Sequence, residues 1–417
     1  MSGTSASSAS ERLDAGARTL LGLLRPADAS ASPIGVRNLS AQVWDAALAL
    51  ALQHAVAPLL LRSLRRNGAY DQVPVTICAR LEEQSRATAL DNLRNYGQFR
   101  RVALALHARD IPVIALKGLH LAELVYRDIS LRPMSDLDIL VPASQVERAV
   151  AALLPLEYTP DNKVPSGYDV TLTHRRLDIL LEVHWSLAAP GEPYTPPLEA
   201  IWRSAGRAKI GGAPALVMSP EFLLLHVCAH LSYHHTFAFG LRALCDIAEI
   251  ANAYTEIDWA LVAAEGQRHG WRRGIAVALR LAHDHVGAAV PGEVLAAIGA
   301  ETLDQELLAD ALEQLVTFSG IPHELQFAPN LMGLASATGL GKKVATLWRR
   351  IFLPRADLAL IYGVPERSAR IPFFYAIRLR DLVRRYAGSV RALGTGEPHL
   401  AATVARHTRL ADWMAGG

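Results

Sequence analysis

The segment from Leu131 to Val141 constrains the fold more than any other part of this 417-residue chain. It reads Leu-Arg-Pro-Met-Ser-Asp-Leu-Asp-Ile-Leu-Val, a turn at Arg132-Pro133 followed by apolar and β-branched residues typical of a strand. Side chains two residues apart share one face of a strand, so the Cα atoms of Asp136 and Asp138 would lie about 6.6 Å apart on that face. Two such carboxylates repel each other unless a divalent cation binds between them, and oxygen ligands suit Mg²⁺ or Mn²⁺. We therefore expect a metal site; the alternative is two solvated aspartates at the end of a strand.

A second feature precedes this strand. The apolar run from Ile111 to Leu116 predicts a buried strand that enters Lys117-Gly118, and a helix is predicted from Leu119 to Arg127. A glycine between a strand and a helix allows a ligand to approach the backbone closely, and the start of a helix favours an anion. Lys117 adds a positive charge suited to phosphate. Taken alone, the pattern favours a solvated surface lysine; the functional alternative is an anion-binding turn.

A third feature is an acidic residue within an apolar strand, predicted from Leu177 to Trp185 after a strand at 168–173. Glu182 lies between Leu181 and Val183, and a buried carboxylate at such a position is costly unless it is paired or bound to metal. Asp178 is a competitor on the same face, nearer the turn and more accessible to water, and we favour Glu182. His184 follows on this face; it either lines an acceptor pocket or hydrogen-bonds a carboxylate.

Composition excludes several classes of protein. Apolar residues make up 51% of the chain, enough for a sizeable core, and the net charge of +2 argues against nucleic acid or an anionic membrane as partner. The three cysteines are widely spaced, which argues against a zinc ribbon or a disulfide scaffold. Neither a secretory signal nor a sufficiently long apolar run is found. We expect a soluble, cytoplasmic protein.

The pattern along the chain predicts three parts: an N-terminal helical segment at 1–84, whose first 10 or so residues are expected to be disordered; a core at 85–215; and an all-helical C-terminal domain at 216–417. In the first part, Pro58 is expected to split a helix that Asn67-Gly68 ends. The proline-rich stretch at 190–214 is predicted as a loop. Helices are expected at 220–235, 239–253, 258–287, 293–318, 338–353, 370–392 and 396–414.

Histidines recur in the first of these C-terminal helices. His226, His230 and His234 have the spacing of one helix face. Such a pattern can bind zinc, but without a neighbouring glutamate or cysteine cluster it favours the lining of a pocket, and we place His230 at the active cleft. Arg242 and Asp246, four residues apart, are expected to pair with each other or to support packing rather than to touch substrate. Arginines near the C-terminus, including Arg355, Arg378 and Arg380, are interpreted as a solvated helix face.

The three features occur in the order found in a known superfamily. Leu-Lys-Gly ending at Gly118, Ser-Asp-Leu-Asp-Ile-Leu-Val beginning at Ser135, and Glu-Val-His-Trp beginning at Glu182 resemble the DNA polymerase β-like nucleotidyltransferases. More closely, they resemble the bacterial family of uncharacterised nucleotidyltransferases, over about residues 85–250. One departure is that Lys117 stands where the superfamily turn has its first glycine.

The resemblance implies an α+β fold, with a small mixed β-sheet core between helical regions. It implies that Asp136, Asp138 and Glu182 bind two Mg²⁺ ions, with Glu182 bridging them or acting as base. The nucleotide-binding residues would be Lys117, Gly118, Ser135 and Arg132, and the acceptor pocket would include His184 and His230. The co-substrate would be a nucleoside triphosphate, with ATP preferred.

Three functions are therefore compared. The favoured one is transfer of a nucleotide to a hydroxyl of a small molecule, peptide or protein, with release of pyrophosphate. The second, which rests on the Lys117 departure, is an inactive nucleotide-binding or interaction module of the same fold. The third is a toxin-like transferase that acts on tRNA.

Overall fold

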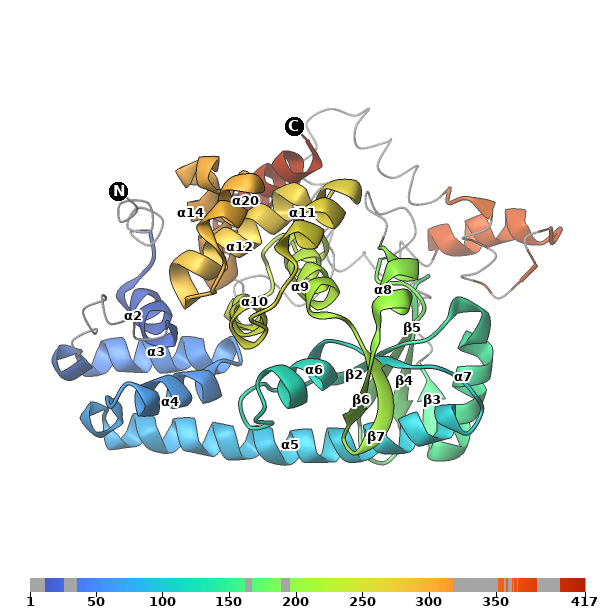
Figure 1. Ribbon diagram of the computed structural model, residues 1–417, viewed down its shortest axis with the longest axis horizontal. Coiled ribbons are helices and arrows are strands. Elements are labelled where there is room, and N and C mark those ends of the chain that lie inside the picture. The colour runs from blue at the N-terminus through green and yellow to red at the C-terminus, as the bar shows by residue number, and fades with distance from the viewer. Residues whose placement is uncertain are drawn as a thin grey trace.

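The computed structural model describes residues 12–25, 36–161, 167–188, 196–317 and 398–416, with shorter stretches between 352 and 380. Its centre is a seven-stranded mixed sheet with helices before and after it in the chain, which confirms the α+β prediction (Figure 1). The N-terminal helices are α2 (Ala15–Leu24), α3 (Ala41–Gln53), α4 (Ala57–Arg66) and α5 (Val75–His107).

The breaks between these helices follow local sequence signals. α3 begins after Ser40, whose hydroxyl accepts a hydrogen bond from the Val43 amide. Pro58 lies in the first turn of α4, where its missing N–H costs nothing, so the predicted split is confirmed. α4 ends at Arg66, directly before Asn67-Gly68, also as predicted. The predicted boundary at residue 84 falls inside α5, and the domain limits stay a prediction.

The sheet has the strand order β3-β4-β5-β2-β1-β7-β6. β2 pairs in parallel with β5 and antiparallel with β1, and β1 pairs in parallel with β7. The strands are β1 (Ile114–Ala115), β2 (Asp136–Leu140), β3 (Tyr158–Pro160), β4 (Asp169–His174), β5 (Leu180–His184), β6 (Gly206–Ile210) and β7 (Ala213–Val217). β1 and β5 are shorter than predicted, because the backbone leaves the ladder before Ile114 and turns at Asp178 with a φ of 54°.

The prediction of a loop at 190–214 was wrong for its second half. That region contains α8 (Leu198–Ser204), all of β6 and the start of β7. Gly211 and Gly212, both at positive φ, join β6 and β7 as a two-residue hairpin turn. The hairpin widens the sheet beyond β1.

After the sheet, the described residues are mainly helical. The elements are α9 (Pro220–Ala229), a π-helix (His230–His234), α10 (Leu241–Ala253), α11 (Trp259–Arg268), α12 (Arg272–Val286), α13 (Gly292–Ala297), α14 (Gln305–Val316) and α20 (Pro398–Ala415). The helix predicted at 258–287 is two helices, because the chain turns at Gly270 with a φ of 71°. The segment predicted at 338–353 lies almost entirely outside the described residues, and of 370–392 the described part is helical from Ile371 to Arg380. No described helix has the length and apolar character needed to cross a bilayer.

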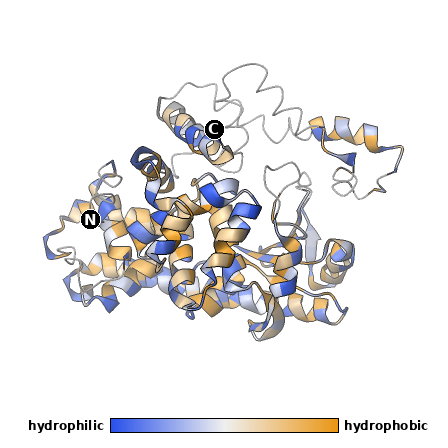
Figure 2. Ribbon diagram, turned by 45° about the horizontal axis from the view of Figure 1, so that its top comes forward, coloured by the Kyte–Doolittle hydropathy of each residue, from blue (hydrophilic) through white to orange (hydrophobic). Residues whose placement is uncertain are grey.

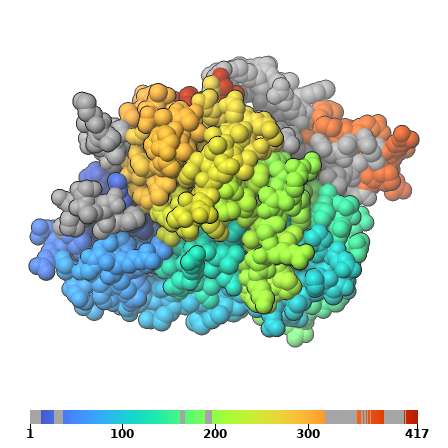
Figure 3. Space-filling view, in the orientation of Figure 1, coloured from blue at the N-terminus to red at the C-terminus, as the bar shows by residue number. Residues whose placement is uncertain are grey.

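Two apolar cores lie against the sheet and share α5, which runs along the bottom of Figure 1. Near its start, Ile77 and Leu81 belong to a core formed with α2–α4 and the C-terminal helices. Nearer its end, Phe99 and Leu106 pack under the sheet with α7 (Val146–Leu153). Hydrophobic and hydrophilic residues alternate around the helices, as amphipathic packing requires (Figure 2). On the face shown in Figure 3, the C-terminal helices lie directly against the N-terminal helices and the sheet region.

Candidate active site

The acidic residues lie on the face of the sheet opposite α5. Along β2, Leu137 and Ile139 point into the core under the sheet, so Asp136 and Asp138 point to the other side. β5 runs parallel to β2 with Asp138 opposite Glu182. The strand period therefore places these carboxylates on a common face, facing the helices that follow the sheet.

Asp138 is at the centre of the polar contacts. It is buried, with His184 Nε2 at 3.0 Å from its Oδ1 and Lys117 Nζ at 3.6 Å from its Oδ2. The same His184 Nε2 lies 3.2 Å from Glu182 Oε2. The structure shows His184 hydrogen-bonded to a carboxylate, and it also lines the cavity, so the two readings of His184 are compatible.

These neighbours shift the ionisation of the buried groups. Burial opposes the charge on Asp138, but Lys117 and His184 hold the pKa of its carboxyl well below the ordinary range. Burial likewise lowers the pKa of His184, but its hydrogen bonds to Asp138 and Glu182 raise it to about 9. Burial and the charge of Asp138 raise the pKa of Asp136 to about 6. The site holds an excess of negative charge that a cation would relieve.

Lys117 occupies an unusual backbone conformation. It is the first residue of α6 (Lys117–His120), the short helix after β1, and its φ is 36°. Positive φ is readily available only to glycine, so lysine is strained here. Burial lowers its pKa, but the carboxylates of Asp138, Glu182 and Asp136 more than offset this and raise it. The residue that replaces the superfamily glycine keeps the turn and adds a cation to it.

Asp136 and its predicted competitor occupy different surroundings. Asp136 lines a cavity on this face of the sheet and accepts a hydrogen bond from the Ser135 hydroxyl, 3.1 Å away. Asp178 precedes β5 in the turn, is exposed, and does not line that cavity. It does not share the face of Glu182, so that expectation was wrong; the strand alternation begins only at Leu180.

Arg132 is held by a buried ion pair. Its Nε and Nη2 lie 3.3 and 3.0 Å from the two carboxylate oxygens of Asp246 in α10, and Tyr126 donates to the same carboxylate at 2.8 Å. Asp246 therefore pairs with Arg132 and not with Arg242, so of the two roles expected for Arg242 and Asp246, mutual pairing was wrong. Arg242 instead donates to the Pro133 carbonyl at 3.4 Å and lies over the Phe239 ring.

The predicted residues converge on one cavity of about 420 Å³ between the sheet, the end of α3, and α9–α10. Its lining includes all of the predicted site residues except Gly118: Lys117, Arg132, Ser135, Asp136, Asp138, Glu182, His184 and His230. Gly118 is buried nearby, where a Cβ atom would lie 2.6 Å from both Arg132 Nη1 and Met134 Cγ. Its missing side chain makes room for these two residues.

Sequence reasoning missed part of the lining. Tyr168, His235, Phe239 and Arg242 also face the cavity. The adjacent pair His234-His235 was visible in the sequence, but an α-helical spacing does not bring His235 to the face of His230. Tyr168 and Phe239 belong to no sequence pattern that would predict their position in the cavity.

The carboxylate group fits a divalent cation. One ligand atom from each of Asp138, Glu182 and His184 lies within 4.8 Å of the other two, and Asp136 adds charge beside them. Carboxylate oxygens are the ligands that Mg²⁺ and Mn²⁺ prefer. Burial and the neighbouring carboxylate of Asp138 raise the pKa of Asp136, and a cation beside the group would oppose that shift.

A mixed sheet carries Asp-x-Asp on one strand and a glutamate opposite it on the parallel neighbouring strand, over a polar cavity, which is the arrangement that the sequence predicted for a nucleotidyltransferase. The chain belongs to the family described as uncharacterised nucleotidyltransferase, whose model matches residues 40–287.

Solved structures that resemble this chain include two of ANT(2'')-Ia. One is the crystal structure of ANT(2'')-Ia in complex with adenylyl-2''-tobramycin, with 16% identity, a TM-score of 0.34, and coverage of 42% of this chain and 98% of that chain. The other is the solution structure of the antibiotic-resistance factor ANT(2'')-Ia, with 15% identity, a TM-score of 0.33, and coverage of 42% and 92%. At these TM-scores, nothing about this chain is argued from them. No curated protein matches the chain.

Proposed function

We propose that the protein transfers a nucleoside monophosphate from a nucleoside triphosphate, with ATP preferred, to a hydroxyl of a small molecule, peptide or protein. The observation that supports this most is the group formed by Asp138, Glu182 and His184 beside Lys117, in a cavity that Asp136 also lines. Asp136, Asp138 and Glu182 would hold Mg²⁺ or Mn²⁺. The cavity volume lies in the range typical of small-molecule sites.

The residues would divide the reaction as follows. Bound divalent metal supplies neutralisation of phosphate charge and orientation of the reacting oxygens. Lys117 neutralises the triphosphate, Ser135 donates to a phosphate oxygen, and Glu182 accepts the proton of the acceptor hydroxyl. The acceptor oxygen bonds to the α-phosphorus, the bond from that phosphorus to the bridging oxygen breaks, and pyrophosphate leaves. The rate acceleration would come from positioning of the reactants and from stabilisation of charge in the transition state.

Two of the predicted residues, Arg132 and His184, would act indirectly in the proposed reaction. Arg132 is paired with Asp246, so we assign it to shaping the phosphate side of the cavity and to supplying positive charge there. His184 positions Asp138 and Glu182 through its hydrogen bonds. The acceptor class, the cytoplasmic location and the exclusion of nucleic acid stay predictions from the sequence.

The test is release of pyrophosphate from each nucleoside triphosphate, with and without Mg²⁺, by the wild type and by Asp136→Asn, Asp138→Asn and Glu182→Gln. Each substitution is expected to lower turnover by about 10²–10³-fold or more, because each removes charge that supports the transition state. Asp178→Asn is the matched control and should leave turnover unchanged, since Asp178 is exposed outside the cavity. Circular dichroism verifies that the variants fold.

Full turnover in both aspartate variants would refute the proposal. Tight nucleotide binding without pyrophosphate release, even with a whole cell lysate supplied as acceptor, would instead favour the inactive module. Transfer that depends on added tRNA would favour the toxin-like alternative.

A further inference from the structure

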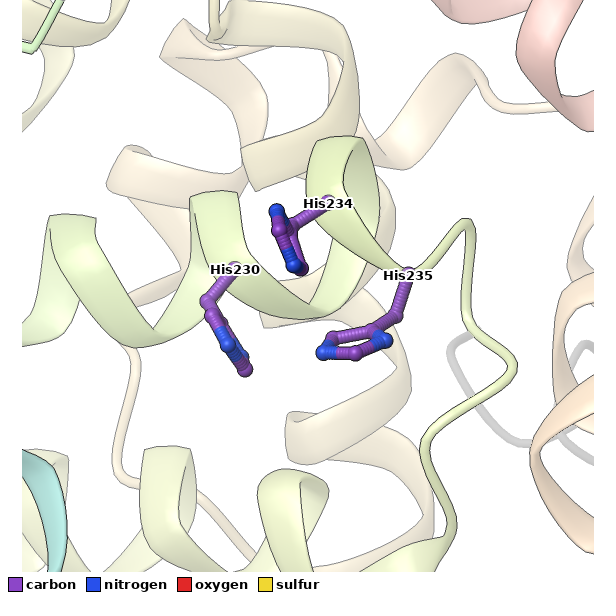
Figure 4. A group of neighbouring side chains, drawn as sticks. All are labelled: His230, His234 and His235. Carbon is purple, nitrogen blue, oxygen red and sulfur yellow. The ribbon is translucent and has the colours of Figure 1, made fainter. Parts of the chain in front are cut away.

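A second group of metal-ligating side chains lies in the same cavity, apart from the carboxylates. His230, His234 and His235 each offer one ring nitrogen, and these atoms lie within 4.8 Å of one another. Figure 4 shows the three rings turned toward a common space, two from the π-helix after α9 and one from the residue that follows it. His230 is predicted to line the acceptor pocket, and none of the three has a part in the chemical step proposed above.

The π-helix is what brings the three rings together. Its wider turn is closed by the His235 amide, which donates to the His230 carbonyl at 3.1 Å. In an α-helix His235 would lie about 140° around the axis from His230. In the wider turn, the fourth and fifth residues after His230 both lie next to it, with ring centroids at 5.1 Å for His234 and 4.5 Å for His235.

The three imidazoles are oriented by packing, and their nitrogens are left available. Among the described residues, none of the three rings has a hydrogen bond or an ion pair. The Phe239 ring stacks on His235 at 4.0 Å and meets the edge of His230 at 5.0 Å. Burial, aided by the charge of Lys117, lowers the pKa of His234 to about 4. Neutral imidazole is the form that binds metal.

We propose that His230, His234 and His235 form a binding site for a transition-metal dication, with Zn²⁺ as the best fit. In a tetrahedral zinc site with Zn–N bonds of about 2.0–2.1 Å, ligand nitrogens lie about 3.3 Å apart, so small rotations of the rings complete the site. Three imidazoles leave the fourth position for water or for a ligand group in the cavity.

The two metal sites differ in chemistry. Imidazole nitrogen favours zinc and related transition metals, whereas the carboxylates of Asp138 and Glu182 favour Mg²⁺ or Mn²⁺. The zinc site does not depend on the proposed activity: it would exist in a chain that transfers no nucleotide.

The first test measures zinc affinity of the full chain by competition with a chromophoric chelator, in excess Mg²⁺. His230→Ala, His234→Ala and His235→Ala are each expected to lower zinc affinity by about 100-fold or more, since removal of an outer partner alone costs 10–100-fold. His226→Gln is the matched control: His226 lines the same cavity one turn earlier, with its ring 6.0 Å from that of His230, and lies outside the group. It should retain the wild-type affinity.

Wild-type zinc affinity in all three alanine variants would overturn the proposal. So would a loss of zinc affinity in Asp138→Asn but in none of the histidine variants, because zinc would then be bound at the carboxylates. A second measurement needs no variant. X-ray absorption of the zinc-loaded wild type should show three imidazole ligands; one imidazole with carboxylate oxygens would overturn the proposal.

Discussion

At the scale of a single residue, Lys117 stands where the pattern of the resembled superfamily has a glycine, yet it keeps the positive φ of the turn. A lysine at a φ of 36° is strained, and it is held by burial and by the carboxylate of Asp138, 3.6 Å from its Nζ. The departure that suggested an inactive module therefore places a positive charge beside the carboxylates of Asp138, Glu182 and Asp136. A triphosphate entering the cavity would meet that charge.

Gly118 gives a prediction at the same scale. Gly118→Ala would drive a methyl group against Arg132 and Met134, and we expect a loss of about 1–3 kcal/mol of stability together with lower activity. Gly97→Ala is the matched control. Gly97 is exposed in α5 with open space around its Cβ position, so alanine there should raise stability by about 0.5–1 kcal/mol. Urea denaturation of both variants measures the two shifts, and equal shifts would contradict the packing role of Gly118.

The candidate site shows which residues sequence reasoning can find. Asp136, Asp138 and Glu182 could be predicted because a charge inside an apolar strand is costly without a partner, and that conflict is visible in the sequence. The pairing of Arg132 with Asp246 and the arrival of His235 could not be predicted. Both depend on how α10 and the π-helix pack on the sheet, which no local spacing encodes.

At the scale of elements, the parallel pairing of β2 with β5 sets the register that the site needs. Both strands were predicted: β2 because apolar and β-branched residues dominate after the Arg132-Pro133 turn, and β5 because apolar residues recur at every second position. The β6–β7 hairpin was missed although Gly211-Gly212 is a recognised turn signal, because the nearby prolines and the short, polar β6 favoured a loop. Position in the sheet outweighed local preference there.

The ion pair between Arg132 and Asp246 connects the segment before β2 to α10, and its removal should be costly. Asp246→Ala is expected to lower stability by about 3–5 kcal/mol, because it leaves the Arg132 charge buried and Tyr126 without its acceptor. Glu199→Ala is the control: it removes the exposed Glu199–Arg203 pair of α8 and should change stability by less than about 0.5 kcal/mol. Chemical denaturation compares the two; similar small losses would show that the buried pair contributes nothing.

At the scale of the whole molecule, buried histidines predict sensitivity to acid. Burial lowers the pKa of His54, His120 and His285 from 6.5 to about 4. The unfolded chain then binds more protons than the folded one as the pH falls below 6.5, so stability is complete above that pH and is lost toward pH 4. Between pH 7 and pH 5 we expect a loss of about 2 kcal/mol for each histidine.

Urea denaturation at the two pH values measures this loss. His285→Gln should remove about 2 kcal/mol of the difference between pH 7 and pH 5. His107→Gln, at an exposed position in α5, should leave the difference unchanged. Equal stability of the wild type at pH 5 and pH 7 would contradict the prediction.

The long helix α5 has a practical consequence for anyone who wishes to dissect the protein. α5 contributes side chains to both apolar cores. Truncation near residue 84 therefore removes Ile77 and Leu81 together with the N-terminal helices that share a core with α10 and α12. The truncated chain would expose apolar surface to water and is expected to aggregate rather than fold. Expression of the sheet should therefore include α2–α5, the described helices that precede it.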